Sequence, residues 1–243
     1  MNKKKTIQRV TSAWCIVTML IGTVFSLSAC NIFAAKDEAV YEDALAIIDE
    51  AENASGDSEA IQKYQEAIAK LETIPDYPQT ASKLEEVKKA HDNRMIEKIK
   101  YAYKVDYFSI NDLLAKMYDR KKADSIAVWM DFSQGVIRGY YDVVVKAIKS
   151  KLKDPNSFTD VGSSFSYTPV AKNGEKAVII VHELTYVIDY TATNSFGAAV
   201  RDQFKYTLDD VEYKYDSQNL TSEEVVAVVQ HLTFDKMCDS LIK

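Results

Sequence analysis

Histidines and paired carboxylates are the side chains of this 243-residue chain best suited to acid–base or metal chemistry. His91, His182 and His231 each lack a second ligand at metal-binding spacing on the same expected element, so the sequence predicts no metal site. The acidic pairs Asp209-Asp210 and Glu223-Glu224 suit a turn and a helix N-terminus, respectively. Neither group of residues predicts a catalytic centre.

Nucleophile motifs are equally sparse. The chain has no Gly-rich phosphate loop, no nucleophile elbow and no Ser-x-x-Lys pattern, and Ser195 falls in an expected turn without a recognisable base. We therefore predict a non-catalytic protein that needs no cofactor. The alternative is a cell-wall hydrolase that uses a carboxylate such as Glu183 or Asp189, a chemistry that needs two suitably spaced carboxyl groups.

The first thirty residues contain cations, an apolar run and a small-residue site, in that order. The run Ala13–Phe25 is too short to cross a membrane comfortably, and Leu27-Ser28-Ala29-Cys30 follows it. This arrangement resembles the lipobox signal of bacterial lipoproteins. The resemblance implies cleavage between Ala29 and Cys30, which removes residues 1–29 as a signal peptide, and diacylation of the Cys30 thiol by palmitate-type chains. The cations of the leader are Lys3, Lys4, Lys5 and Arg9.

Lipidation at Cys30 predicts a protein that is attached to the cell membrane and folded in water on its extracytoplasmic face. Two or three acyl chains attach a protein stably, whereas one chain holds it only marginally. The alternative is an uncleaved anchor or an ordinary secretory leader over residues 10–29. Because Cys15 leaves with the leader and Cys30 carries lipid, no internal disulfide is expected. Cys238, on the apolar side of an expected terminal helix, is interpreted as a buried structural residue.

The charge of the mature chain limits its partners. Removal of the leader leaves 214 residues with 26 Lys and Arg and 36 Asp and Glu, a net charge of −10. Nucleic-acid binding needs concentrated positive charge, so we predict no nucleic-acid partner. The low content of glycine and proline, seven and four residues, indicates a folded chain rather than a flexible spacer.

The first part of the mature chain is expected to be helical. Tyr41–Ile48 and Tyr64–Leu71 each place an aromatic, a small and a large aliphatic residue on one helix face, and the turn formers of Asn53–Ser58 separate them. The two segments therefore predict an antiparallel helical hairpin. A short helix is also expected after Ser109, which is predicted to be its N-cap.

The second helix of the predicted hairpin resembles a helix of a known repeat. Ala60, Tyr64 and Ala67, with Pro75 beyond them, resemble the second helix of a tetratricopeptide repeat, in which small residues let paired helices approach closely. The resemblance implies a module whose hairpins contact a protein partner. A generic helical hairpin with alanines at its crossings is the alternative.

A long helix is expected before the spacing of apolar residues changes from that of a helix to that of a strand. An apolar pattern runs from residue 124 or 125 to Leu152, and Asp154-Pro155 blocks further helix. Gly135 and Gly139 within it are interpreted as a bend or a close contact with another helix.

Strand signals dominate the last part of the chain. Ser163–Val170 and Ala177–Thr193 are rich in β-branched and aromatic residues, and Asn173-Gly174 between them is a hairpin turn signal. Antiparallel strands are expected to continue over residues 198–215. A capping box at Thr221–Glu224 then marks the start of the last expected helix.

The longest expected strand is predicted to have one buried and one wetter face. Ile180, His182 and Leu184 are assigned to the buried face by their alternate spacing. Glu183 and Asp189 are assigned to the wetter face. His182 is thereby predicted to lie among apolar side chains.

Two strings in this half resemble a small α+β domain of secreted and lipid-anchored bacterial proteins. Leu152–Phe158 resembles the helix end of that domain, and Asp189–Gly197 resembles its turn, although Ala198 stands where the pattern has a second glycine. The resemblance covers residues 136–216 and implies fold and location rather than an activity. The turn, which we interpret chiefly as structural and alternatively as a recognition tip for a peptide or glycan, consists of Asn194, Ser195, Phe196 and Gly197.

The predicted fold class is α+β, with N-terminal helical hairpins followed by an antiparallel sheet covered by helices. The expected domains are a tetratricopeptide-like helical module over residues 30–125 and an α+β domain over residues 126–243. The predicted function is non-catalytic binding or scaffolding at the bacterial cell envelope, with an envelope protein as the partner. The alternative within binding proteins is a wall glycan or solute held by the sheet and its turn.

Overall fold

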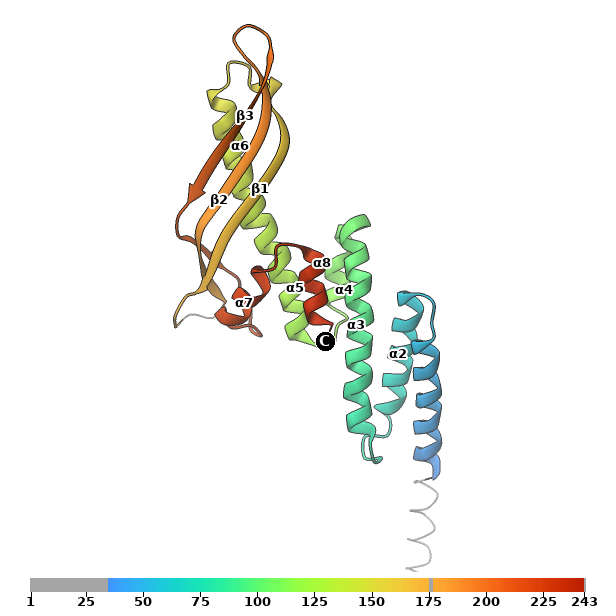
Figure 1. Cartoon of the computed structure of the whole chain (residues 1–243). Helices are drawn as coiled ribbons and strands as arrows, with labels where there is room; N and C mark the ends of the chain where they lie inside the picture. Colours follow the sequence, from blue (N-terminus) through green and yellow to red (C-terminus); the bar gives the residue numbers. More distant parts are fainter. Residues whose placement is uncertain (1–34, 175–176, 243) are drawn as a thin grey trace, which may run out of the picture. The chain divides into compact units, whose positions relative to one another are not determined.

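The computed structural model of the chain describes residues 35–174 and 177–242. The predicted cleavage and lipidation site, Ala29 and Cys30, lies outside these residues. The chain forms two compact units, unit 1 up to Arg94 and unit 2 from Met95 onward (Figure 1). Among the described residues, the helices are too short or too polar for any of them to cross a membrane.

Unit 1 is helical, as the sequence predicts. It contains a helix over residues 35–52, α2 (Asp57–Leu71) and the first part of α3 (Thr80–Val105). The first two helices form the expected hairpin, and their alanines are fully buried where the helices cross, which allows the backbones to approach closely. The fully buried alanines are Ala44, Ala51, Ala60 and Ala67.

Ion pairs join the helices of unit 1 at its surface. Lys70 Nζ lies 2.6 Å from Asp43 Oδ2, and Lys63 Nζ lies 2.5 Å from Glu50 Oε2. Both pairs connect α2 to the helix over residues 35–52. Because these side chains are one-third or more exposed, each pair adds little stability, and the buried apolar core holds the hairpin together.

The long helix that the sequence predicts in unit 2 is interrupted by a π-helical segment. A π-helical segment, Ser133–Arg138, separates α5 from α6, and Gly135 and Gly139 lie in and beside it. A Cβ at Gly135 would meet no atom within 4 Å, so the interpretation of this glycine as a close helix contact is wrong, while the irregularity itself is confirmed. The helical elements before the sheet are η1 (Tyr107–Ser109), α4 (Ile110–Leu114), α5 (Arg120–Phe132) and α6 (Gly139–Lys151).

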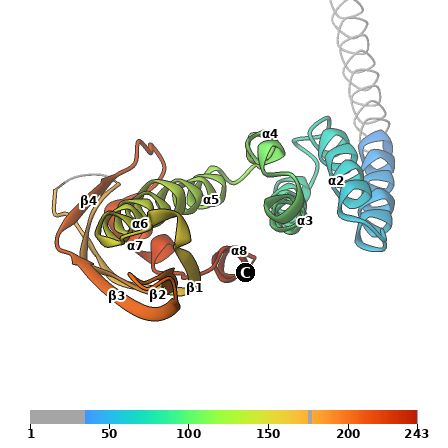
Figure 2. The same ribbon diagram turned by 90° about the horizontal axis from the view of Figure 1, so that it is seen from above.

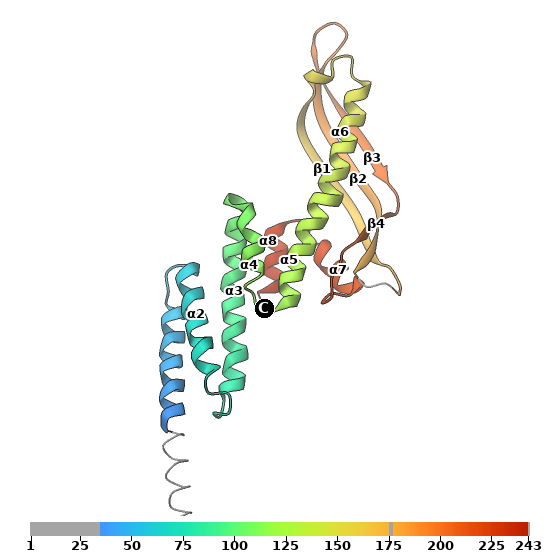
Figure 3. The same ribbon diagram turned by 180° about the vertical axis from the view of Figure 1, so that it is seen from behind.

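The sheet of unit 2 has four antiparallel strands, with β2 pairing to all the others. The first half of β2 pairs with β4, the second half pairs with β3, and β1 lies along the other side. Figure 2 and Figure 3 show α6 along one face of the sheet, with the strands curved around it. The α+β fold class is therefore confirmed. The strands are β1 (Thr159–Ala171), β2 (Val178–Thr193), β3 (Ala199–Leu208) and β4 (Val211–Lys214).

A bulge in β2 reverses the predicted faces of its first half. Glu183 adopts a φ of +49°, and the register between β1 and β2 shifts at this point. The extra residue moves the preceding side chains to the opposite face, so Val181 is buried while Ile180 and His182 are only partly covered. The assignment of Ile180 and His182 to the same face as Leu184 is therefore wrong.

Two helices complete unit 2. α7 (Ser222–Val229) contacts α5, β1 and β2, and α8 (Phe234–Leu241) packs against α5 and the end of α3. Phe234 stacks on Tyr103 with ring centroids 4.0 Å apart, and Lys100 Nζ lies 2.7 Å from Asp239 Oδ1. These contacts group residues from Met95 onward with the sheet, whereas the sequence placed the module boundary after residue 125.

The capping box at the start of α7 is present as predicted. Thr221 Oγ1 accepts a hydrogen bond from the Glu224 backbone N–H, and Glu224 Oε2 accepts one from the Thr221 backbone N–H. We expect Thr221→Ala to lower the free energy of unfolding by about 1 kcal/mol, because an N-terminal amide loses its acceptor. Urea denaturation measures the effect.

Ser109→Ala is the control for this substitution. Ser109 stands before α4 as expected, but its side chain caps no amide of that helix and donates instead to the Asp106 carbonyl. The loss for Ser109→Ala should be smaller than for Thr221→Ala. Equal losses would show that the capping box has no special role.

Candidate functional site

The turn between β2 and β3 holds its shape through its own hydrogen bonds. Asn194 Oδ1 accepts from the backbone N–H groups of Phe196 and Ala198, at 2.9 and 3.0 Å. Gly197 has a φ of +82°, a conformation that glycine adopts easily, whereas Asn194 does not adopt a positive φ. The structural role of Asn194 and Gly197 is therefore visible in the contacts.

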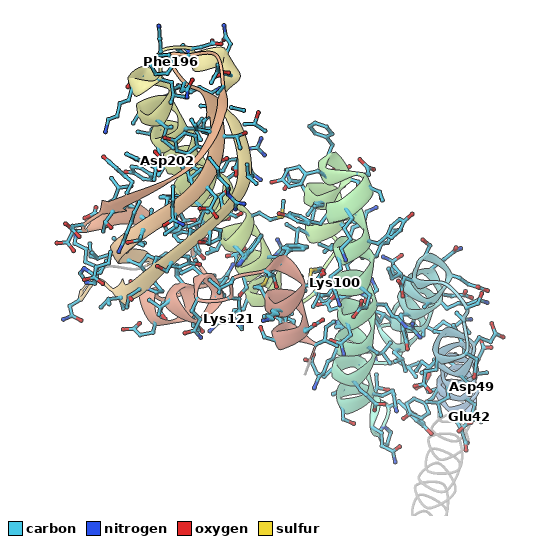
Figure 4. All side chains as sticks on the ribbon, turned by 45° about the horizontal axis from the view of Figure 1, so that its top comes forward. Glu42, Asp49, Lys100, Lys121, Phe196 and Asp202 are labelled. Atoms are coloured by element: carbon cyan, nitrogen blue, oxygen red, sulfur yellow. The ribbon has the colours of Figure 1, made fainter. Side chains whose placement is uncertain are left out.

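Phe196 projects from this turn into solvent. Its side chain is 95% exposed, and Figure 4 shows it at the far end of the β2–β3 hairpin. Ser195 beside it is also exposed. Because the backbone below Phe196 is fixed by Asn194, the ring is presented from a defined position, which suits contact with another molecule.

The end of α6 meets the base of the same turn. Ser157 Oγ accepts a hydrogen bond from the Thr193 backbone N–H at 2.9 Å, which joins the segment after α6 to the end of β2. Lys149 Nζ lies 5.3 Å from the ring centroid of Phe158, and Lys151 Nζ lies 4.8 Å from that of Phe204. We call residues 146–157 and 193–201 together the sheet tip.

The sheet face that does not meet α6 carries mostly small polar side chains. Directly paired residues of neighbouring antiparallel strands point to the same face, so they form rows across the sheet. Thr185 lies between Ser166 and Thr207 in one row, and its hydroxyl is 2.9 Å from that of Thr207. A second row, through Asp189, contains Gly162 and Gln203.

The two carboxylates considered for hydrolysis lie on β2 in different settings. Asp189 accepts hydrogen bonds from Gln203 Nε2 at 2.7 Å and from Arg201 Nη2 at 3.5 Å, both on β3. Glu183 is exposed and forms the bulge. Asp189 thus stabilises the β2–β3 pairing. Asp189 and Glu183 do not form a shared site in the described part of the chain.

The three histidines lie apart and have different tasks. His91 is fully buried in α3, where Nδ1 lies 2.9 Å from Asp92 Oδ1. His182 contacts Asp210 at the point where β3 gives way to β4, and the His231 carbonyl accepts from Trp129 Nε1 at 2.8 Å. In the described part of the chain, no three His, Cys, Asp or Glu side chains form a group able to hold a metal ion.

Cys238 has the environment of a structural residue. It is fully buried beside Phe234 and Met237 on α8, and burial raises the pKa of its thiol to about 12. The thiolate is the reactive form of cysteine, so this side chain is unreactive at neutral pH. The expected burial of Cys238 is confirmed.

A carboxylate ties the start of β1 to α6. Asp160 Oδ2 accepts hydrogen bonds from the Tyr141 hydroxyl and from Ser163 Oγ, the latter at 2.6 Å. Burial opposes ionisation of Asp160, but these hydrogen bonds outweigh it and lower the pKa of the carboxyl below its usual value. The cluster holds the charged carboxylate in place and orients α6 along the sheet.

Gly197→Ala is expected to weaken unit 2 by about 1 kcal/mol. A Cβ at this position would meet no atom within 4 Å, so the cost comes only from the positive φ. Gly135→Ala is the matched control, because the space is equally open there and the backbone is helical. It should be neutral or stabilising by about 0.5–1 kcal/mol. Thermal unfolding of both variants tests the difference, and equal effects would contradict it.

The sequence pattern did not point to the sheet tip as a whole. The signal available was a run of lysines, Lys146, Lys149, Lys151 and Lys153, which follows the spacing of a solvent-exposed helix end. Only the fold shows that this run meets the Phe196 turn.

Comparison with known proteins gave no match to a protein family, to a curated protein or to a solved structure. Function is therefore inferred from the residues and contacts of this chain alone. The features that bear on function are the predicted leader, the helical hairpin of unit 1, and the sheet and tip of unit 2.

Proposed function

We propose that this chain is a lipid-anchored protein on the extracytoplasmic face of the bacterial cell membrane, with a non-catalytic binding or scaffolding function. The lipobox-like sequence Leu27-Ser28-Ala29-Cys30 supports the location. After cleavage, only residues 31–34 separate the acylated cysteine from the first described helix. Unit 1 would therefore work close to the membrane surface.

The unequal distribution of charge is the observation that supports a protein partner. Residues 35–94 contain 7 Lys and Arg and 15 Asp and Glu, a net charge of −8. Residues 95–243 contain 19 and 21, a net charge of −2. A partner of unit 1 is therefore expected to present a basic surface, because complementary charge speeds association and selects partners.

The helix over residues 35–52 offers a face for such a partner. Tyr41, Ala44 and Ile48 point into the core of unit 1, while Glu42 and Asp49 lie on the opposite, exposed side (Figure 4). This division of faces leaves the acidic side accessible in the folded unit. Recognition along the face of a helical hairpin fits the tetratricopeptide-like pattern of the sequence.

In-cell crosslinking followed by mass spectrometry tests the proposal. The acylated protein should give reproducible crosslinks from residues 41–94 to one envelope protein, and Cys30→Ala should lose them because the chain is no longer held at the membrane. A charge-reversed face, Glu42→Lys with Asp49→Lys, should reduce the same crosslinks at least several-fold. Unchanged crosslinks in that variant would refute the helical face as the binding surface.

The sheet favours a second candidate, a wall glycan or a polar solute. The hydroxyl rows around Thr185 and the planar groups of Asp189 and Gln203 are the kinds of side chain that hydrogen-bond sugar hydroxyls. Saturable binding of soluble wall fragments, lost in Gln203→Ala with the fold intact, would support this candidate. Binding that persists in Gln203→Ala would count against the sheet face.

A further inference from the structure

The sheet tip concentrates positive charge in a chain that is acidic overall. Residues 146–157 and 193–201 contain four lysines and one arginine but only one acid, Asp154, a net charge of +4. The mature chain as a whole carries −10. The tip is thus a positively charged region of a negatively charged chain. The net charge of the whole chain therefore does not describe how this end of unit 2 interacts.

The lysines of the tip differ in their contacts from the ion-paired lysines of unit 2. Ion pairs with carboxylates hold Lys100, Lys104 and Lys121. Lys149 and Lys151 instead lie over aromatic rings, and no salt bridge to either is found within residues 35–174 and 177–242. Their ammonium groups keep their charge available to a ligand outside the chain.

The carboxylates in and beside the tip are occupied by internal donors. Asp154 Oδ1 accepts from the Asn156 backbone N–H at 3.1 Å, and Asp189 accepts from Gln203 and Arg201. Asp202 accepts from the Tyr190 hydroxyl at 3.2 Å. These acids take part in the turn and the strands, and the charge of the tip itself stays mostly positive because Asp154 is its one acid.

Apolar side chains accompany this charge. Phe196 is 95% exposed and Val200 is 44% exposed, and Ala198 and Ala199 between them are also exposed. Folding leaves these groups in water although the Asn194 hydrogen bonds fix the turn that carries them. An exposed aromatic ring next to lysines is the combination that binds the interface of a bilayer, where the ring enters the headgroup region and the cations meet phosphates.

We propose that the sheet tip docks on an anionic phospholipid surface, with Phe196 inserted at the headgroup level and Lys146, Lys149, Lys151 and Lys153 facing lipid phosphates. Charge complementarity favours an anionic occupant. The exposed Phe196 favours a bilayer over a soluble polyanion, because a soluble polyanion offers the ring no apolar environment. The docking rests on unit 2 alone and does not depend on acylation of Cys30.

Vesicle sedimentation with an unacylated mature chain, residues 30–243 with Cys30→Ala, tests the docking. Binding to vesicles of phosphatidylglycerol and phosphatidylcholine should exceed binding to pure phosphatidylcholine at least tenfold. The triple variant Lys146→Gln, Lys151→Gln, Lys153→Gln should lower the partition coefficient by about tenfold or more, since each lysine near an anionic surface contributes to binding. Equal binding to both vesicle types would overturn the proposal.

Matched controls separate the tip from general charge and exposure. Lys116→Gln, Lys214→Gln and Lys236→Gln make the same change of charge at exposed lysines outside the tip and should leave partition within about twofold. Phe196→Ser should weaken binding several-fold. Phe108→Ser, at a ring that is 94% exposed elsewhere in unit 2, should not. A loss with the control lysines equal to that of the tip lysines would refute the assignment to the tip.

Insertion of the turn has its own readout. In a Phe196→Trp variant, brominated lipid should quench the new indole, while Trp129, buried beside Phe234, should stay unquenched in the parent chain. Strong binding to soluble polyphosphate together with no quenching would replace the bilayer with a soluble polyanion as the ligand. Failure of these experiments would leave the lipid anchor and the protein partner of unit 1 untouched, because neither involves the tip.

Discussion

Replacing Cys30 with alanine is expected to move the protein from the membrane fraction to the soluble or secreted fraction and to abolish incorporation of labelled palmitate. Without the thiol, the chain has no atom to carry the diacyl group that the lipobox-like sequence predicts. Each buried methylene contributes about 0.8 kcal/mol, so loss of two long chains removes essentially all stable attachment. Fractionation and labelling of growing cells measure both effects.

The two other cysteines are the controls for Cys30→Ala. Cys15→Ala lies in the predicted leader, and Cys238→Ala replaces a buried thiol of α8, so both variants should keep the label and the membrane location. Cys30→Ala protein that stays in the membrane with its leader attached would identify residues 10–29 as an uncleaved anchor instead. Label retained in Cys30→Ala would refute lipidation at this cysteine.

Phe132→Ala is expected to lower the free energy of unfolding of unit 2 by about 3–5 kcal/mol. Phe132 is 2% exposed at the end of α5, and its ring lies 5.4 Å from that of Tyr167 and 5.2 Å from that of Tyr213. It therefore fills the space where the helix meets β1 and β4. Its removal leaves a cavity that the two tyrosines cannot close, because their hydroxyls are bonded to the Val229 carbonyl and to Asp131.

Urea denaturation followed by tryptophan fluorescence measures this loss. The chain has two tryptophans, and Trp14 lies in the predicted leader, so Trp129 is the reporter on unit 2 in the chain without residues 1–29. Phe108→Ala makes the same change at a ring that is 94% exposed and should cost less than about 0.5 kcal/mol. A loss below 1 kcal/mol for Phe132→Ala would show that this contact does not hold α5 on the sheet.

Local signals in the sequence predicted the elements of the fold well. The hairpin of unit 1, the Asn173-Gly174 turn region and the Thr221–Glu224 capping box all depend on residues that are neighbours in the chain. Such features follow from propensity and periodicity, which a sequence displays directly. The α+β class follows from them, because a run of helices precedes a run of strands.

The errors occurred where a distant contact or an extra residue decides the structure. Nothing in the composition of β2 marks Glu183 as a bulge, and this residue alone moves His182 to the other face. Ser109 stands at a helix start, but its hydroxyl prefers the Asp106 carbonyl to an amide of α4. Residue types do not show which of two neighbouring hydrogen-bond partners of similar strength a side chain will choose.

The candidate site was predicted in part. The Asn194–Gly197 turn and its exposed Phe196 were predicted as a unit, because the turn chemistry is local. The lysines that join Phe196 at the tip come from α6 and the segment that follows it, more than forty residues earlier in the chain. Only the packing of α6 along the sheet brings the two together.

α8 follows the sheet in the sequence, and this order determines when unit 2 completes its folding. Its residues reach back to α3 through Lys100–Asp239, across a sequence separation of 139 residues, and through the stacked rings of Tyr103 and Phe234. A chain that emerges N-terminus first from the ribosome can form the β-hairpins early, but Tyr103 cannot stack on Phe234 until the residues of α8 have emerged. The end of α3 therefore stays incompletely packed until α8 is available to contact it.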